Sequence, residues 1–176
     1  MNRIRMMAGG VSACMVLATS AWAAGHGAMA QMPAADAPVS TAVTASDCWI
    51  RQLPAPAPSG GFLVLHNAGT QAVNLVGARS SDYGQVMIHQ TKEENGVSKM
   101  SMVHQVALPA GGQLALKPGS YHLMLEQARS GLKVGDQAQV DFALDNGQRV
   151  TAQCEVRPAN AMPGMAGHGM KHGMKH

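Results

Sequence analysis

The sequence contains few aromatic and few charged side chains: aromatic residues make up 3% and charged residues 13% of its 176 positions. With only two each of Phe, Tyr and Trp, a core must be built mostly from Val, Leu, Ile, Ala and Met. The formal charge is +3, but Arg3 and Arg5 lie in a segment that we expect to be removed, which leaves 11 basic against 10 acidic residues, or +1. This balance gives no electrostatic basis for binding nucleic acid.

The chain also lacks an apolar run suited to a transmembrane helix. Residues 1–23 resemble a secretory signal, with a basic start, an apolar stretch that is short and interrupted by Gly, and Ala21-Trp22-Ala23 as a small-x-small cleavage pattern. A second interpretation is a lipoprotein signal, in which Val11-Ser12-Ala13-Cys14 leaves Cys14 lipidated. Apolar residues continue past Cys14, so we favour cleavage near residue 23. Both interpretations predict an exported protein, in a bacterial periplasm.

Cysteine is scarce as well, and export changes how Cys48 and Cys154 are interpreted. An oxidising compartment favours a disulfide between them, which would close a loop of roughly 100 residues and contribute at most about 4.7 kcal/mol. The alternative is that both are thiolate ligands of a metal ion. A widely separated pair without CxxC spacing favours the disulfide.

Short segments of β-type sequence, punctuated by Gly, Pro and Asn, run along the middle of the chain. We expect strands at residues 43–51, 61–67, 72–78, 85–91, 99–106, 112–116, 121–126, 137–144 and 148–156. Asn95-Gly96 is typical of a hairpin turn. No amphipathic helix of useful length is present, so the pattern predicts an antiparallel β-sandwich or barrel. The chain divides into a signal (1–23), a flexible linker (24–42), one domain (43–158) and a tail (159–176).

Methionine and histidine are the residues in excess, with 14 and 8 copies. Three pairs are spaced two residues apart: Met87/His89, Met100/Met102 and His122/Met124. This spacing places both side chains of a pair on one face of a strand. Three such pairs on neighbouring strands would converge, and thioethers with imidazoles suit Cu(I). Methionine is also the soft ligand that survives where free thiolates would form disulfides.

Each of these residues also has an ordinary structural interpretation. A single Met on a strand is usually core filler, and a single His is usually a hydrogen-bonded surface residue. The coincidence of residue type, spacing and parity favours a metal site. His104 extends the face of Met100 and Met102, but we expect it at the surface, and we expect His66, which has no paired Met, to be structural.

The C-terminal tail repeats His-Gly-Met-Lys and is rich in Gly. Its candidate metal ligands are Met162, Met165, His168, Met170, His172, Met174 and His176. The pattern predicts a flexible arm that binds copper, and the alternative is a solvated tail that binds metal only incidentally.

The spacing of four candidates resembles a known family. His89, ten residues, Met100, twenty-one residues, His122, one residue and Met124 match the signature of the periplasmic copper chaperones of the PCu(A)C type. The turn-like stretches 108–112, 116–119 and 132–136, and the strand 121–125, are similar to that family as well. Cys48 departs from the family, because a small residue is expected there.

The resemblance implies a cupredoxin-like Greek-key β-sandwich that binds one Cu(I) through His89, Met100, His122 and Met124. The pair spacing adds Met87 and Met102 as candidate supporting side chains. It also implies delivery of copper to the CuA centre of cytochrome c oxidase, together with thioredoxin-like assembly factors. The tail is similar to C-terminal extensions thought to bind Cu(II), so it would hold Cu(II) or a second Cu(I). We expect a monomer that is not an enzyme.

Two other functions compete with this expectation. In a copper storage or resistance protein, the tail would be the main site and the domain a scaffold. A blue-copper electron-transfer protein requires a Cys ligand, and no Cys lies between Met87 and Met124. A hydrolase is not supported, because no nucleophile elbow or acid–base pair is present.

Overall fold

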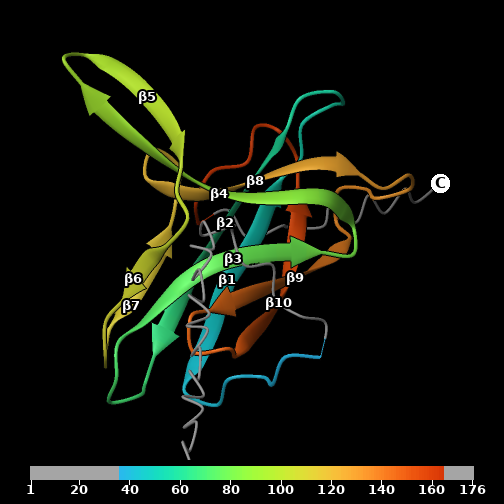
Figure 1. Cartoon of the computed structure of the whole chain (residues 1–176). Helices are drawn as coiled ribbons and strands as arrows, with labels where there is room; N and C mark the ends of the chain where they lie inside the picture. The colour runs from blue at the N-terminus through green and yellow to red at the C-terminus, as the bar shows by residue number, and fades with distance from the viewer. Residues whose placement is uncertain (1–35, 165–176) are drawn as a thin grey trace, which may run out of the picture.

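The computed structural model describes residues 36–164, and this range forms ten β-strands and no helix (Figure 1). The strands are β1 (Val43–Arg51), β2 (Ser59–Asn67), β3 (Val73–Ser80), β4 (Tyr83–Glu94), β5 (Val97–Met102), β6 (Val106–Leu108), β7 (Gln113–Leu116), β8 (Tyr121–Ala128), β9 (Gln137–Leu144) and β10 (Arg149–Arg157). The predicted all-β class is confirmed. Residues 36–164 therefore include no helix that is long and apolar enough to span a bilayer. The predicted signal, with Cys14, lies outside the described residues.

All ten strands belong to one hydrogen-bonded sheet. Its order is β5-β4-β8-β2-β1-β10-β9-β3-β6, and β7 pairs with β2. Neighbouring strands are antiparallel apart from β1 and β10, the first and last strands, which run parallel at the centre of the order. The sheet curves until β3 packs against β4, which encloses one core (Figure 1).

The core is mostly aliphatic, as the low aromatic content predicts. Ile50, Leu65, Leu75, Val140 and Phe142 are fully buried. Cys48 and Cys154 form a disulfide that joins β1 to β10 across a sequence separation of 106 residues. The predicted disulfide is thus present, and a thiolate role for these two sulfurs is excluded in this structure.

The Asn95-Gly96 turn joins β4 to β5, as the sequence predicts. Asn95 and Gly96 both have positive φ values, 54° and 75°, which is the backbone of a two-residue hairpin turn. Sequence analysis placed one strand over residues 99–106, but β5 ends at Met102 and a separate strand begins at Val106. The break occurs because the chain turns away from β4 after Met102. Val106 then pairs with Leu75 of β3, where it is buried.

Candidate metal centre

Three adjacent strands carry the Met/His pairs. Strand β4 lies between β5 and β8, so that His89 is paired directly with Met102 on one side and with His122 on the other. Met87 is paired with Met124. Directly paired residues share a face of the sheet, and so do residues two apart along a strand.

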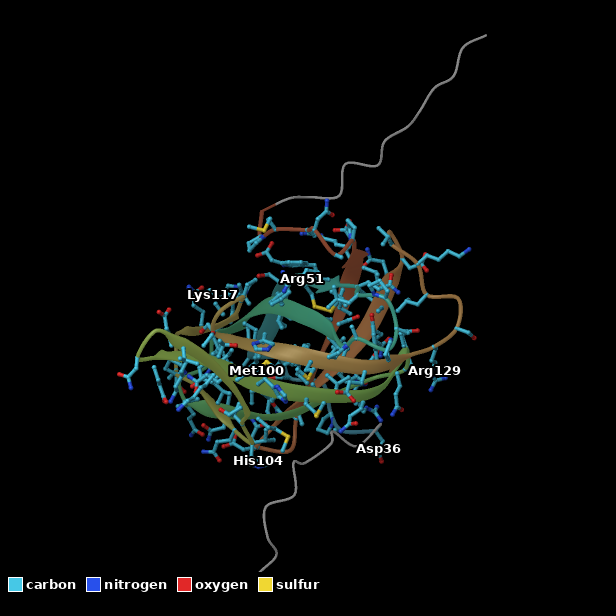
Figure 2. The ribbon with its side chains drawn as sticks, turned by 90° about the horizontal axis from the view of Figure 1, so that it is seen from above. Asp36, Arg51, Met100, His104, Lys117 and Arg129 are labelled. Carbon is cyan, nitrogen blue, oxygen red and sulfur yellow. A yellow bond between two sulfur atoms is a disulfide. The ribbon has the colours of Figure 1, made fainter. Side chains whose placement is uncertain are left out.

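Met100 completes the set from β5. Its cross-strand partner is Thr91, which has the same parity as His89, so Met100 lies on the same face. All six side chains therefore point to one side of the three-stranded unit. Figure 2 looks onto this part of the molecule, with Met100 labelled near its centre.

This face is the outer face of the sheet. The alternate positions on β4 and β8, which include Val86, Ile88, Leu123 and Leu125, are buried in the core. Met87, His89, His122 and Met124 are half-buried. The side chains on the edge strand are more open, because Met100 and Met102 are 52% and 49% exposed. None of the six is therefore core filler.

His122 is held by a turn of the main chain. Its Nδ1–H donates a hydrogen bond to the Ser120 carbonyl oxygen at 2.9 Å. A carbonyl only accepts, so the hydrogen of the neutral ring is on Nδ1 and the lone pair is on Nε2. Ser120 belongs to the turn after β7, in which Gly119 has a φ of 74° that favours glycine. A backbone carbonyl that fixes the tautomer in this way is typical of metal-ligating histidines.

The free nitrogen of His122 faces a sulfur. Nε2 lies 3.2 Å from Sδ of Met100. In the neutral ring neither atom carries a hydrogen, so two lone pairs face each other. Nitrogen and sulfur donors on a tetrahedral d10 ion lie about 3.5 Å apart when zinc bond lengths are used. The pair is therefore arranged nearly as two ligands of one small cation would be.

His89 completes the histidine pair. Its ring and that of His122 meet edge to face, with centroids 6.1 Å apart. Its Nδ1 is buried and has no hydrogen-bond partner among residues 36–164. Burial lowers the pKa of His89, the neighbouring His122 lowers it further, and Glu126 opposes both effects. The ring is thus kept neutral, which is the form that binds a metal ion.

Two cavities border the six side chains. A cavity of about 210 Å³ lies on the side of His122 and Met124, and Arg51, Phe62 and Thr91 also line it. Met87 and Met102 instead line a smaller cavity of about 40 Å³ against β3. In addition, Nε2 of Gln85 donates to Sδ of Met87 at 3.4 Å. Met87 and Met102 therefore lie to one side of the His122–Met100 pair.

The donor set is soft. Residues 36–164 contain no group of three or more His, Cys, Asp and Glu side chains that would suit a harder ion. Imidazole and thioether donors without a carboxylate fit Cu(I) better than Mg²⁺, Ca²⁺ or Zn²⁺. The residues present thus fit a copper(I) ion, and metal binding by them stays a prediction.

The remaining candidates lie elsewhere. His104 is exposed and falls between β5 and β6, outside both strands. His66 has a structural contact, because its Nε2 lies 2.9 Å from Oγ of Ser46. Met162 is 57% exposed in the segment after β10, and the other tail candidates lie outside the described residues. Sequence analysis missed Ser120, Thr91 and Arg51, although the turn-like stretch 116–119 ends directly before Ser120.

The sequence and the fold of this chain are similar to those of known proteins. The LpqE-like family, described as "Putative lipoprotein LpqE-like", matches residues 43–156. The "Uncharacterized protein RP573" of Rickettsia prowazekii is 35% identical over 107 residues, which are 60% of this chain and 58% of the relative. The "Putative lipoprotein Lxx21020" of Leifsonia xyli is 28% identical over 106 residues, 60% of this chain and 63% of the relative. The chain thus spans less than two thirds of the length of each relative.

Two solved structures share the fold of this chain. The apo PCuAC domain of PmoF2 superposes with a TM-score of 0.57 at 20% identity, over 72% of this chain and 97% of that domain. The CuI-DR1885 protein of Deinococcus radiodurans has a TM-score of 0.52 at 26% identity, over 70% of this chain and 81% of that protein. The chain therefore belongs to the LpqE-like family and has the fold of the PCuAC domains, as the spacing of His89, Met100, His122 and Met124 predicted.

Proposed function

We propose that this protein is an exported copper chaperone that binds one Cu(I) ion through His89, Met100, His122 and Met124. One observation carries the proposal: Nε2 of His122, which holds the lone pair in the neutral ring, lies 3.2 Å from Sδ of Met100 on a face that also holds His89 and Met124. The names of the structural neighbours support the choice of metal, since one is a copper-bound PCuAC domain and another a CuI form.

The site suits transfer as well as binding. The two histidines lie on β4 and β8 and are half-buried, whereas Met100 lies on the edge strand and is half exposed. An incoming donor can therefore reach the ion from the Met100 side without moving the core. Thioether ligands do not form disulfides, which suits a compartment in which Cys48 and Cys154 are oxidised. The role is that of a carrier and not of an enzyme.

The finer parts of the proposal follow from the sequence. The recipient is the CuA centre of cytochrome c oxidase or a thioredoxin-like assembly factor, and the compartment is the periplasm. The lipoprotein description of the family supports export. Residues 1–23 act as the signal, 24–42 as a linker, 43–158 as the copper-binding domain, and 159–176 as a tail that holds Cu(II) or a second Cu(I). The protein acts as a monomer.

The test is copper K-edge X-ray absorption, with stoichiometry, on a Cu(I)-loaded chain that ends at Gly164. We expect one copper per chain with mixed sulfur and imidazole scattering. A second sample with Met100→Leu and Met124→Leu should lose the sulfur scattering and the tight binding. If the chain ending at Gly164 holds no copper and the full chain does, the site lies in the tail, and storage becomes the better description.

A further inference from the structure

The side chain of Arg51 lies close to the candidate metal ligands, on the same outer face of the sheet. We call the part of this face that carries the six Met and His side chains the Met/His face. Gly60 of β2 is paired with Arg51 of β1 on one side and with Met124 of β8 on the other. Paired residues lie on one face of a sheet, so Arg51 and Met124 point to the same side. A Cβ built on Gly60 would lie 3.9 Å from Nη2 of Arg51, which shows that the guanidinium reaches over β2.

An aromatic ring holds the guanidinium in this position. The guanidinium carbon of Arg51 lies 5.3 Å from the centroid of the Phe62 ring, and this ring packs against Trp49 with centroids 4.5 Å apart. A Cβ on Gly60 would lie 3.0 Å from Cζ of Phe62, so the glycine leaves the space that the ring and the guanidinium use. Stacking occupies the flat face of a guanidinium and leaves the N–H groups at its edge available as donors.

No acidic side chain balances the charge of Arg51. All ten Asp and Glu residues of the chain lie between residues 36 and 155, and the ion pairs within this range involve Arg79, Lys99, Arg149 and Arg157 as the cations. The partner of Arg51 on β10 is Arg157, which is itself bound to Glu155 at 2.7 Å. Like charges directly opposite each other in a sheet are unfavourable. An anion bound to Arg51 would offset this repulsion.

A cavity next to Arg51 has room for such an anion. Arg51 lines the cavity of about 210 Å³ that also borders His122 and Met124. Along the wall that residues 36–164 give this cavity, Arg51 is the only side chain with a full charge. Glu126, the acid two residues beyond Met124 on β8, lines a different cavity. The cavity therefore has a positive potential and space for a small anion with several waters.

We propose that this cavity is a carboxylate-binding site, in which the Arg51 guanidinium holds the carboxylate beside His122 and Met124. A guanidinium donates two parallel N–H···O bonds to a carboxylate, and the Thr91 hydroxyl in the cavity wall is a further donor. One guanidinium matches the single charge of a carboxylate, whereas a phosphate dianion would require a second cation. The carboxylate belongs to a small free acid or to an Asp or Glu side chain of a docking protein.

The site has a consequence for copper, and this consequence alone rests on the proposed function. A Cu(I) ion held by four neutral donors keeps its positive charge, and a carboxylate between Arg51 and Met124 lies within about two strand spacings, or roughly 10 Å, of it. Each ligand should therefore favour binding of the other by the same factor. Opposite unit charges at this distance near a protein surface change affinity about 15-fold, and screening at about 0.1 M salt reduces the factor to about threefold.

The test begins with acetate and the full-length, copper-free protein labelled with ¹⁵N. Sodium acetate replaces sodium perchlorate at constant ionic strength and neutral pH, and NMR records the Arg51 Nε–H and the Gly60 and Gly119 amides. We expect saturable shifts with a dissociation constant on the order of 10 mM. Shifts that rise linearly without saturation overturn the proposal. So does inorganic phosphate that binds more tightly than acetate at the same signals.

A second probe, N-acetyl-aspartate N-methylamide, distinguishes the two sources of the carboxylate. Its carboxylate is attached to a peptide backbone, as in an acidic side chain of a docking protein. Binding as tight as that of acetate would show that the cavity admits such a side chain. Binding of acetate alone would assign the site to small free acids.

Three variants test the roles of charge, fork and space. Arg51→Gln should abolish the saturable shifts, and Arg51→Lys, which keeps the charge but loses the two-point contact, should weaken binding about tenfold. Gly60→Ala keeps Arg51 but places a methyl group against Phe62 in the cavity floor, and should also weaken binding. The control is Arg129→Gln, at an exposed arginine after β8, which should change nothing. Equal binding in Arg51→Gln and wild type overturns the proposal.

The copper measurement is made separately, by anaerobic competition for Cu(I) in acetate and in perchlorate at about 0.1 M. We expect about threefold tighter binding in acetate for wild type and no difference for Arg51→Gln, which also controls for direct contact between acetate and copper. Equal affinities in the two salts for wild type overturn the coupling. If Met100→Leu/Met124→Leu binds Cu(I) as wild type does in a chain ending at Gly164, the proposed function fails, while the copper-free titration still decides the carboxylate site.

Discussion

Met100 and Met102 offer an internal test of the proposed ligand set. Both lie on β5, on the same face, and their exposures of 52% and 49% are nearly equal. Only Met100 has its sulfur 3.2 Å from the lone pair of His122. We therefore expect Met100→Leu to weaken Cu(I) binding strongly and Met102→Leu to weaken it far less.

The magnitudes follow from the geometry. Loss of a residue that only supports a metal ligand costs 10–100-fold in affinity, so loss of a ligand should cost more than about 100-fold, or about 2.7 kcal/mol. The effect on stability should be small, because Met→Leu conserves volume and half of each side chain is already in water. We expect each variant to unfold within about 0.5 kcal/mol of the parent.

The assay is competition for Cu(I) against a chromophoric chelator under anaerobic conditions, with urea unfolding of the same samples. A chain ending at Gly164 serves as the parent, so that the tail does not mask a loss at the face. Equal losses for Met100→Leu and Met102→Leu would show that proximity to His122 does not select the ligand. Unchanged affinity in Met100→Leu would remove Met100 from the site.

Two further predictions concern the apo protein. Replacing Cys48 and Cys154 together by Ala should lower the free energy of unfolding in urea by up to about 4.7 kcal/mol, because the disulfide closes a loop of 106 residues; a loss below about 1 kcal/mol would contradict this. NMR titration should give His89 a pKa below 6.5, raised by His122→Gln and lowered further by Glu126→Gln. Since the unfolded chain then binds more protons than the folded one, stability should fall as the pH drops below about 6.5, and His89→Gln should flatten that dependence.

The sequence predicts most of the fold because turn chemistry and alternation act locally. Asn95-Gly96 requires positive φ values, and the hairpin forms where they occur. The end of β5 was placed four residues too late, since nothing local to residues 103–106 shows that Val106 pairs with β3. The parallel pairing of β1 with β10 and the packing of Ala161 against Trp49 and Phe62 likewise depend on contacts between distant parts of the chain.

The candidate site is predictable for a similar reason. Parity along each strand places Met87 with His89, Met100 with Met102, and His122 with Met124, and it needs no knowledge of the fold. Which strands are neighbours, and therefore which pairs meet, depends on the topology β5-β4-β8. A turn pattern in the sequence marks the neighbourhood of Ser120, but only the main-chain geometry shows that its carbonyl faces His122. Arg51 comes from a strand far away in the sequence, so no residue pattern pointed to it.

On strands β4 and β8, the side chains that build the core and the candidate metal donors point to opposite faces of the sheet. Ile88 and Leu123 are buried, while the residues beside them, His89 and His122, point outward. A substitution among the outward residues therefore removes a donor without opening a cavity in the core. Binding of a soft ion and folding of the domain should respond to different substitutions. A variant of Ile88 or Leu123 should lower stability first and affect metal binding only through unfolding, which is the reverse of what we expect for Met100.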